Sequence, residues 1–187
     1  MLRVRILAAG LLASLGVIAA AQAPSKAPAR PAPSTGKPVG SLAQIMRGIY
    51  FPNSNLIFDV QQHDPAAPKP SAAPGGTASS AYANAYSGWE VVENAAIALT
   101  DGVDLLLTPG RLCQNGKPVP VQQADFQKFA SRMRAAGLAV LQAARTKNQE
   151  RVSDATNDLA DACSNCHEVY RDKGPADSPA RCTPASK

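Results

Sequence analysis

The sequence has few of the signals that mark β-structure, nucleic-acid binding or catalysis. No segment alternates apolar and polar residues as β-strands do, and no Lys/Arg-dense run is interleaved with aromatic residues, which argues against a nucleic-acid partner. With two histidines, no phosphate-binding loop and no acid–base cluster, the chain is not expected to be an enzyme. Its one long apolar run covers residues 6–18, so no membrane span is expected after it.

The amino-terminal residues have the features of a secretory signal peptide. Two arginines precede the apolar run, and the small residues Ala19, Ala20 and Ala21 follow it. We therefore expect residues 1–21 to be removed on export to the periplasm. Export places the four cysteines of the chain in an oxidising compartment, where thiols are paired or chemically occupied.

Three proline-rich segments divide the rest of the chain. Residues 22–40 and 64–76 are rich in Pro, Ala and Ser, and residues 174–187 have a similar composition. Such segments bury too little apolar surface to offset the entropy lost on ordering. We therefore interpret 22–40 as a flexible spacer, 64–76 as a loop and 174–187 as a tail, attached to a domain that spans residues 41–173.

Apolar residues between these segments recur every three or four positions, which is the spacing of amphipathic helices. The pattern runs over residues 82–106, 126–144 and 152–170. A shorter pattern covers residues 42–60, where we expect Pro52 to break or kink the helix because proline lacks a backbone donor. Four such helices predict an all-α fold, an antiparallel four-helix bundle.

The last predicted helix contains a Cys-x-x-Cys-His pattern, formed by Cys163, Cys166 and His167. Positions i and i+3 share one face of a helix, so the two thiols can bond the two vinyl groups at one edge of a porphyrin. The imidazole of the following residue can then bind the iron. This pattern is typical of c-type haem attachment and predicts one covalent haem c per chain.

Three other interpretations of these cysteines are weaker. A thioredoxin-like site would need a neighbouring strand–helix–strand pattern, which the sequence lacks. A zinc site drawn from all four cysteines would leave His167 unused. A disulfide between Cys163 and Cys166 would strain a helix.

The stretch from Cys163 to Arg171, at the end of a final helix, resembles the class II cytochromes c, the cytochrome c′ family. The resemblance covers roughly residues 41–173 and implies a four-helix bundle with haem near the carboxyl end of the last helix. Met46 and Arg47 are similar to the distal-ligand stretch of low-spin members. The chain departs from the family in the proline of its first helix, in its proline-rich first loop and in its extra pair of cysteines.

Met46 is our candidate for the sixth iron ligand. In an up-down-up-down bundle the first helix begins and the fourth ends at one pole, and Met46 and His167 each lie roughly 7–8 Å from it. The alternative is that Met46 is a core residue and the iron is five-coordinate. Tyr170 is expected near the haem edge. Arg47 and Arg171 can pair with the haem propionates, or they are solvated surface residues.

The two remaining cysteines, Cys113 and Cys182, follow the ends of the second and fourth helices, which share a pole. We expect a disulfide between them that closes a loop of about 70 residues. Met133 lies well inside the third helix and is expected in the core. His63 follows the first helix and is expected to be solvated.

Two functions are compatible with such a site. A His/Met pair saturates the iron, which favours one-electron transfer to and from other periplasmic or membrane-bound redox proteins. A five-coordinate iron favours the binding of nitric oxide or carbon monoxide instead. The sequence leaves the oligomeric state open, with a homodimer as one alternative.

Overall fold

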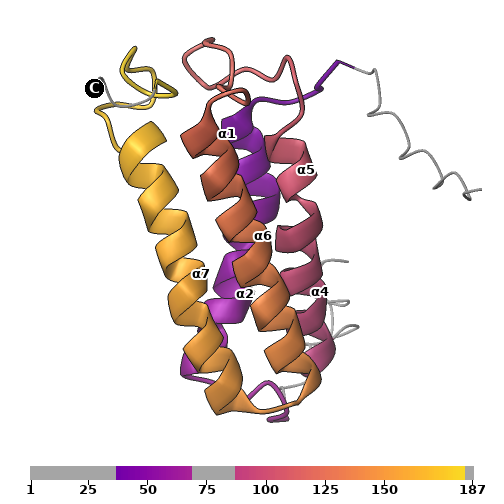
Figure 1. The fold of residues 1–187 in the computed structure, drawn as a ribbon. Helices are drawn as coiled ribbons and strands as arrows, with labels where there is room; N and C mark the ends of the chain where they lie inside the picture. The colour runs from indigo at the N-terminus through magenta and orange to yellow at the C-terminus, as the bar shows by residue number, and fades with distance from the viewer. Residues whose placement is uncertain (1–36, 69–86, 184–187) are drawn as a thin grey trace, which may run out of the picture. The chain divides into compact units, whose positions relative to one another are not determined.

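The computed structural model describes residues 37–68 and 87–183, and their regular structure is helical. The predicted all-α four-helix bundle is confirmed (Figure 1). Within these two ranges the β-type pairing is one isolated bridge between Leu112 and Pro118. The predicted signal peptide, most of the spacer and part of the 64–76 loop lie outside the described residues, as do the first residues of the predicted second helix.

The first arm of the bundle is one continuous helical segment of four parts. The parts are α1 (Leu42–Ile45), the π-helical turn η1 (Met46–Tyr50), α2 (Phe51–Phe58) and the 3-10 turn η2 (Asp59–Gln61). Ser41 starts the arm in a capping box, because its hydroxyl accepts from the Gln44 N–H and the Gln44 side chain accepts from the Ser41 N–H.

Pro52 does not break this arm, so the expected break at the proline was wrong. The Phe51 N–H donates to the carbonyl of Met46, five residues back, so the chain passes through a π turn just before the proline. Pro52 then falls in the first turn of α2, where its missing donor is tolerated. The Asn53 side-chain amide donates to the Ile49 carbonyl at 2.7 Å, beside this turn.

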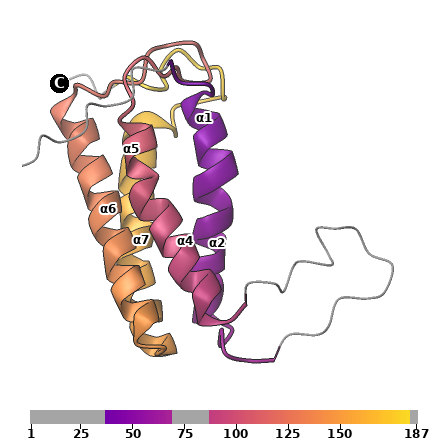
Figure 2. The same cartoon turned by 90° about the vertical axis from the view of Figure 1, so that its right-hand side faces the viewer.

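The other arms are regular. The second consists of α4 (Trp89–Asp101) and α5 (Val103–Leu106), the third is α6 (Ala124–Arg145) and the fourth is α7 (Gln149–Tyr170). Lys147, with a φ of 53°, turns the chain between α6 and α7, which pack as antiparallel neighbours (Figure 2). None of the helices in the described ranges is both long and apolar enough to cross a membrane.

One core runs along the bundle axis. α6 packs against both α4 and α7, while α2 packs against α4 and α7. The helices α4 and α6 approach closely at Gly137, where an added Cβ would lie 2.5 Å from the Thr100 hydroxyl oxygen. The largest side chains with almost no solvent exposure line this core: Ile57, Leu99, Val103, Val140, Val152, Thr156 and Leu159.

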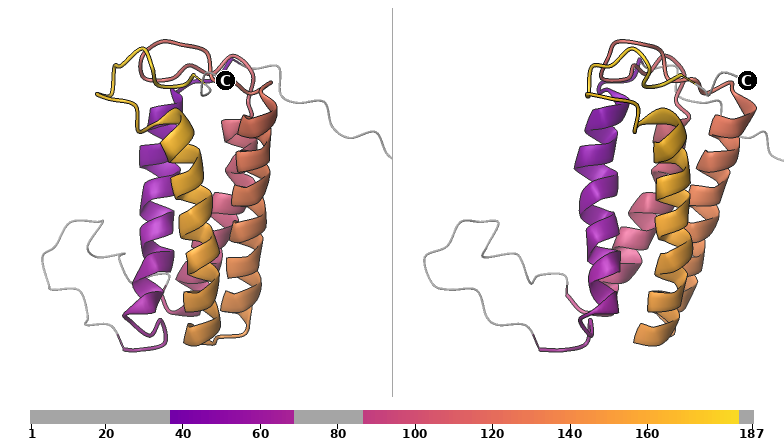
Figure 3. Two further views of the ribbon diagram at one scale, coloured as in Figure 1. Left: turned by 60° about the vertical axis from the view of Figure 1, so that its left-hand side comes forward. Right: turned by 90° about the vertical axis from the view of Figure 1, so that its left-hand side faces the viewer.

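The two poles of the bundle differ in construction. At the pole where α1 begins and α7 ends, which we call the upper pole, the loop after α5 and the carboxyl-terminal segment gather (Figure 3). Buried Arg111 organises this loop, because its guanidinium donates to the carbonyls of Leu105 and Gly40. Leu42 adds a bond from its N–H to the Leu112 carbonyl at 2.8 Å. The first arm therefore begins and the fourth arm ends at the same pole, as predicted.

Candidate haem site

The last two turns of α7 carry the Cys-x-x-Cys-His residues. Cys163 and Cys166 are both free and half-buried, and His167 is half-buried beside them. Cys163 packs against the main core. Cys166 packs against a second, smaller cluster at the upper pole, formed by Cys113, Val119, Phe126 and Tyr170. Both thiols therefore lie on the bundle side of α7, as their shared helix face predicts.

Burial controls the protonation of this site. It raises the pKa of the Cys163 thiol, and it raises that of Cys166 to about 11 with further contributions from Cys163 and Asp125. Burial, followed by the nearby Arg171 guanidinium, lowers the pKa of His167. At neutral pH the thiols are therefore protonated and the imidazole is neutral, the state in which histidine binds metals.

The set of available donors suits haem better than zinc. The predicted disulfide between Cys113 and Cys182 is confirmed, with Cα atoms 6.5 Å apart. These two sulfurs are therefore unavailable as zinc ligands. Over residues 37–68 and 87–183 no group of three or more Cys, His, Asp or Glu side chains could hold a metal ion. Two free thiols one turn apart and one imidazole remain, which is the donor set of c-type haem attachment.

Tyr170 is held on three sides at the carboxyl end of the site. Its hydroxyl donates to an Asp125 carboxylate oxygen at 2.6 Å, and its ring packs edge-to-face against Phe126 and Phe129 at centroid distances of 5.2 and 6.2 Å. Burial and the hydrogen bond to the carboxylate raise the pKa of Tyr170. Sequence analysis missed Asp125, although an acidic residue in the first turn of a helix is a recognisable feature.

Met46 is the first residue of the π turn η1 on the first arm. It is half-buried and packs against the main core. Four residues later, Tyr50 is buried and its hydroxyl donates to the Leu99 carbonyl at 3.3 Å. Burial is the main cause of its raised pKa; the Arg134 charge opposes the shift, and the thiols of Cys163 and Cys166 add to it.

Tyr50 was not identified from the sequence. The signal for it is its position four residues after Met46, which places the two on neighbouring parts of one helix face.

The two arginines expected near the haem propionates lie at the upper pole. The exposed Arg47 guanidinium donates to the Gln114 side-chain oxygen at 2.9 Å. The Arg171 guanidinium pairs with the neighbouring Asp172 carboxylate at 2.6 Å, and this contact lowers the pKa of Asp172. Both contacts lie at the surface, where such pairs contribute little to stability.

Met133 and His63, predicted to be a core residue and a solvated residue, lie where they were predicted. Met133 is buried in the core, and His63 is exposed with its Nδ1 2.8 Å from an Asp59 carboxylate oxygen.

Comparison with protein families gave a match to part of the chain. Residues 119–171 match a protein family described as Cytochrome C′. This span covers α6 and α7 and includes the Cys-x-x-Cys-His residues. Searches of curated proteins and of solved structures found no similar protein.

Proposed function

We propose that this chain is a class II cytochrome c, an exported electron carrier with one covalent haem; the match of residues 119–171 to the cytochrome c′ family supports the proposal. The observation that carries the proposal is the pair of free thiols on α7, one turn apart and followed directly by His167. The other two cysteines of the chain are joined to each other, so only this pair can attach a porphyrin.

In this proposal Cys163 and Cys166 hold the haem through thioether bonds. The two thiols would be joined to the two vinyl groups of the porphyrin, by addition of S–H across C=C with no net oxidation. His167 binds the iron through its neutral imidazole. The bound haem supplies a reversible one-electron couple, and the surrounding core restricts water and so helps to determine the reduction potential.

Met46 is proposed as the sixth ligand. Support comes from its half-buried place on the first arm, where it packs against the same core as Cys163. A filled sixth position leaves no site for a gas molecule and so favours electron transfer. If Met46 serves only as core, the iron is five-coordinate and the protein binds nitric oxide or carbon monoxide.

Arg47 and Arg171 are proposed to pair with the haem propionates. Both are exposed at the upper pole, and their present partners are the Gln114 amide and the Asp172 carboxylate. Because these contacts are solvent-accessible, exchanging them for a propionate costs little. A guanidinium matches a carboxylate with two parallel hydrogen bonds. The partners would be other exported or membrane-bound redox proteins.

The full chain should be expressed in a host with c-type haem maturation, and its mass and its ferric and ferrous spectra recorded. We expect the protein in the periplasmic fraction, with its mass increased by that of one haem. The haem should stay attached after denaturation. Replacing Cys163 and Cys166 by Ser should abolish this attachment, whereas replacing Cys113 and Cys182 by Ser should retain it. A chain without covalent haem, or haem retained in the first variant, would refute the proposed attachment.

A further inference from the structure

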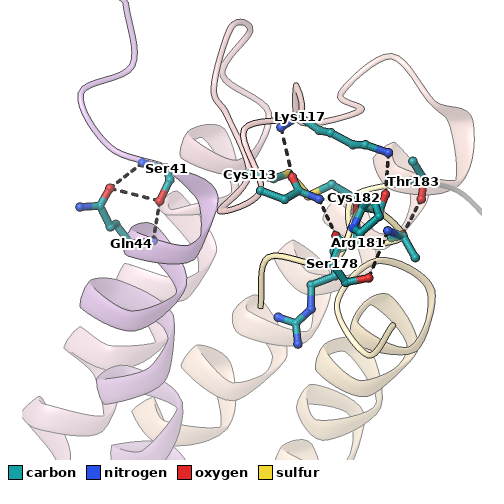
Figure 4. The surroundings of a disulfide bond; sticks show 11 residues. Ser41, Gln44, Cys113, Lys117, Ser178, Arg181, Cys182 and Thr183 are labelled. Atoms are coloured by element: carbon teal, nitrogen blue, oxygen red, sulfur yellow. Dashed lines mark hydrogen bonds between the residues drawn. A yellow bond between two sulfur atoms is a disulfide. The ribbon is translucent and has the colours of Figure 1, made fainter. Parts of the chain in front are cut away.

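We propose that the carboxyl-terminal segment 171–183, anchored by the Cys113–Cys182 disulfide, is a clamp that positions the last turn of α7 and with it the His167 side of the haem. The inference rests on the proposed function for its reference to haem. Residues 174–187 were predicted to be a tail tied to the bundle by this disulfide, and the described part of the segment, up to Thr183, is also bound by hydrogen bonds at many points (Figure 4).

The clamp first binds the end of α7 itself. The last carbonyls of a helix lack partners within it, and the Cys182 N–H donates to the Tyr170 carbonyl at 2.9 Å. Lys173 reaches forward to the Thr183 carbonyl at 2.8 Å, and Arg181 reaches back to the Gly174 carbonyl at 2.6 Å. The segment therefore closes on itself directly beyond the helix.

The clamp is also fixed to the loop after α5. The Asn115 side-chain amide donates to the carbonyls of Ser178 and Arg181, at 2.9 and 3.1 Å. Cys182 has a φ of 61°, a conformation that residues with side chains adopt only where the surroundings enforce it. Its disulfide and its backbone bond to Tyr170 supply that constraint.

Contacts lead from the disulfide to the proposed haem side of α7. Cys113 and Tyr170 belong to the same buried cluster, and Cys166 packs against that cluster. Tyr170 lies three residues after His167, and the His167 carbonyl accepts from the N–H groups of Arg171 and Asp172, both at 2.8 Å. Movement of the clamp would therefore move the turn that carries the imidazole.

The test compares the wild-type holoprotein with a Cys113→Ser/Cys182→Ser variant by amide hydrogen exchange and by haem spectroscopy. We expect exchange at residues 169–172 to accelerate by at least about tenfold beyond the change elsewhere in α7, because that turn alone loses its restraint. We also expect a shifted reduction potential and an altered ferric spectrum at a temperature where the variant is fully folded.

Two further variants keep the test decisive. Val152→Ala creates a cavity at the other end of α7 and should accelerate exchange without singling out residues 169–172 or altering the haem spectrum. Asn115→Ala keeps the disulfide but removes two hydrogen bonds to the segment, so it should accelerate exchange at residues 169–172 by a smaller factor. It replaces the double variant as the test in case the double variant does not fold.

The outcomes separate the two proposals. Equal acceleration along all of α7 in every variant, with unchanged haem properties, would show that the disulfide is a general staple and overturn the clamp. A wild-type chain without covalent haem would refute the proposed function, while the exchange pattern would still decide whether the clamp restrains α7.

Discussion

The surroundings of Cys163, Cys166 and His167 on α7 favour the neutral forms of these side chains. The raised thiol pKa of Cys166 follows mainly from burial against the smaller cluster at the upper pole, and the lowered pKa of His167 from burial and the nearby Arg171 charge. Neutral thiols and a neutral imidazole can be buried with less cost than their charged forms. The same side chains on an exposed helix would titrate nearer their ordinary values.

Met46 provides the prediction at this scale. Replacing it by Leu preserves apolar volume but removes the thioether sulfur, so we expect the ferric spectrum to change from low-spin to high-spin and to lose the weak near-red band of a Met–iron bond. Met133→Leu is the matched control, since Met133 is buried in the core of α6. Each variant should lower the free energy of unfolding by less than about 1.5 kcal/mol.

An unchanged ferric spectrum in Met46→Leu would rule Met46 out as a ligand. Carbon monoxide or nitric oxide binding by the wild type would then favour the gas-binding function.

At the scale of helices, the first arm departs most from regular geometry. Its π turn begins at Met46 and ends at Tyr50, whose hydroxyl donates to the Leu99 carbonyl of α4. Single π turns inside α-helices often occur at functional sites. The extra residue changes the phase of the helix by about 100°, so it alters which residues on either side of the turn face the core.

The contact between α4 and α6 gives the prediction at this scale. In Gly137→Ala the new Cβ would lie 2.5 Å from the Thr100 hydroxyl oxygen, which is held by its bond to the Ala96 carbonyl. We expect the free energy of unfolding, measured by chemical denaturation, to fall by about 1–2 kcal/mol despite the better helix propensity of alanine.

Gly48→Ala is the matched control, because a Cβ there meets no atom within 4 Å. It should be neutral or raise the free energy of unfolding by up to about 1 kcal/mol. Equal effects of the two substitutions would mean that the helices do not pack closely at Gly137.

At the scale of the whole molecule, the upper pole joins all four arms. Arg111 connects Leu105 in α5 to Gly40, which precedes the Ser41 cap of α1, and the disulfide connects the same loop to the segment after α7. The opposite pole is closed by side chains, with Gln61 bound to Thr156 and Gln149 bound to the Val60 carbonyl. The covalent restraint therefore lies at the pole that carries the proposed haem.

The stability of the bundle should fall in alkali because of two buried tyrosines. Tyr50 and Tyr170 have folded-state pKa values raised above the ordinary value near 10, by burial in both cases and by the Asp125 carboxylate in the second. Their contribution is fully present below about pH 10 and is lost as the pH rises toward the folded-state pKa, because only the unfolded chain releases the protons.

The free energy of unfolding, measured with denaturant at about pH 8 and about pH 11, would show this loss. The two values lie on either side of the ordinary tyrosine pKa of about 10. Tyr50→Phe and Tyr170→Phe should each reduce the difference in unfolding free energy between the two pH values, while lysine titration remains common to all three proteins. The same pH dependence in wild type and variants would contradict the prediction.

The sequence by itself determined the helical class, the four-arm bundle and the chemistry of α7. These depend on local periodicity and on residue types at adjacent positions, and Cys163, Cys166 and His167 are brought together by one helix. The Cys113–Cys182 pairing was also accessible, because bundle topology places two helix ends at one pole.

Only the tertiary structure decided how Pro52 is accommodated, which residues surround the site and how the carboxyl-terminal segment is held. Tyr50 gains its place through contact with Leu99, and Asp125 through its bond to Tyr170. The segment after α7 is ordered by the disulfide and by Asn115, which is distant in sequence. Composition describes only what a segment can bury by itself, whereas these residues are fixed by partners on other arms.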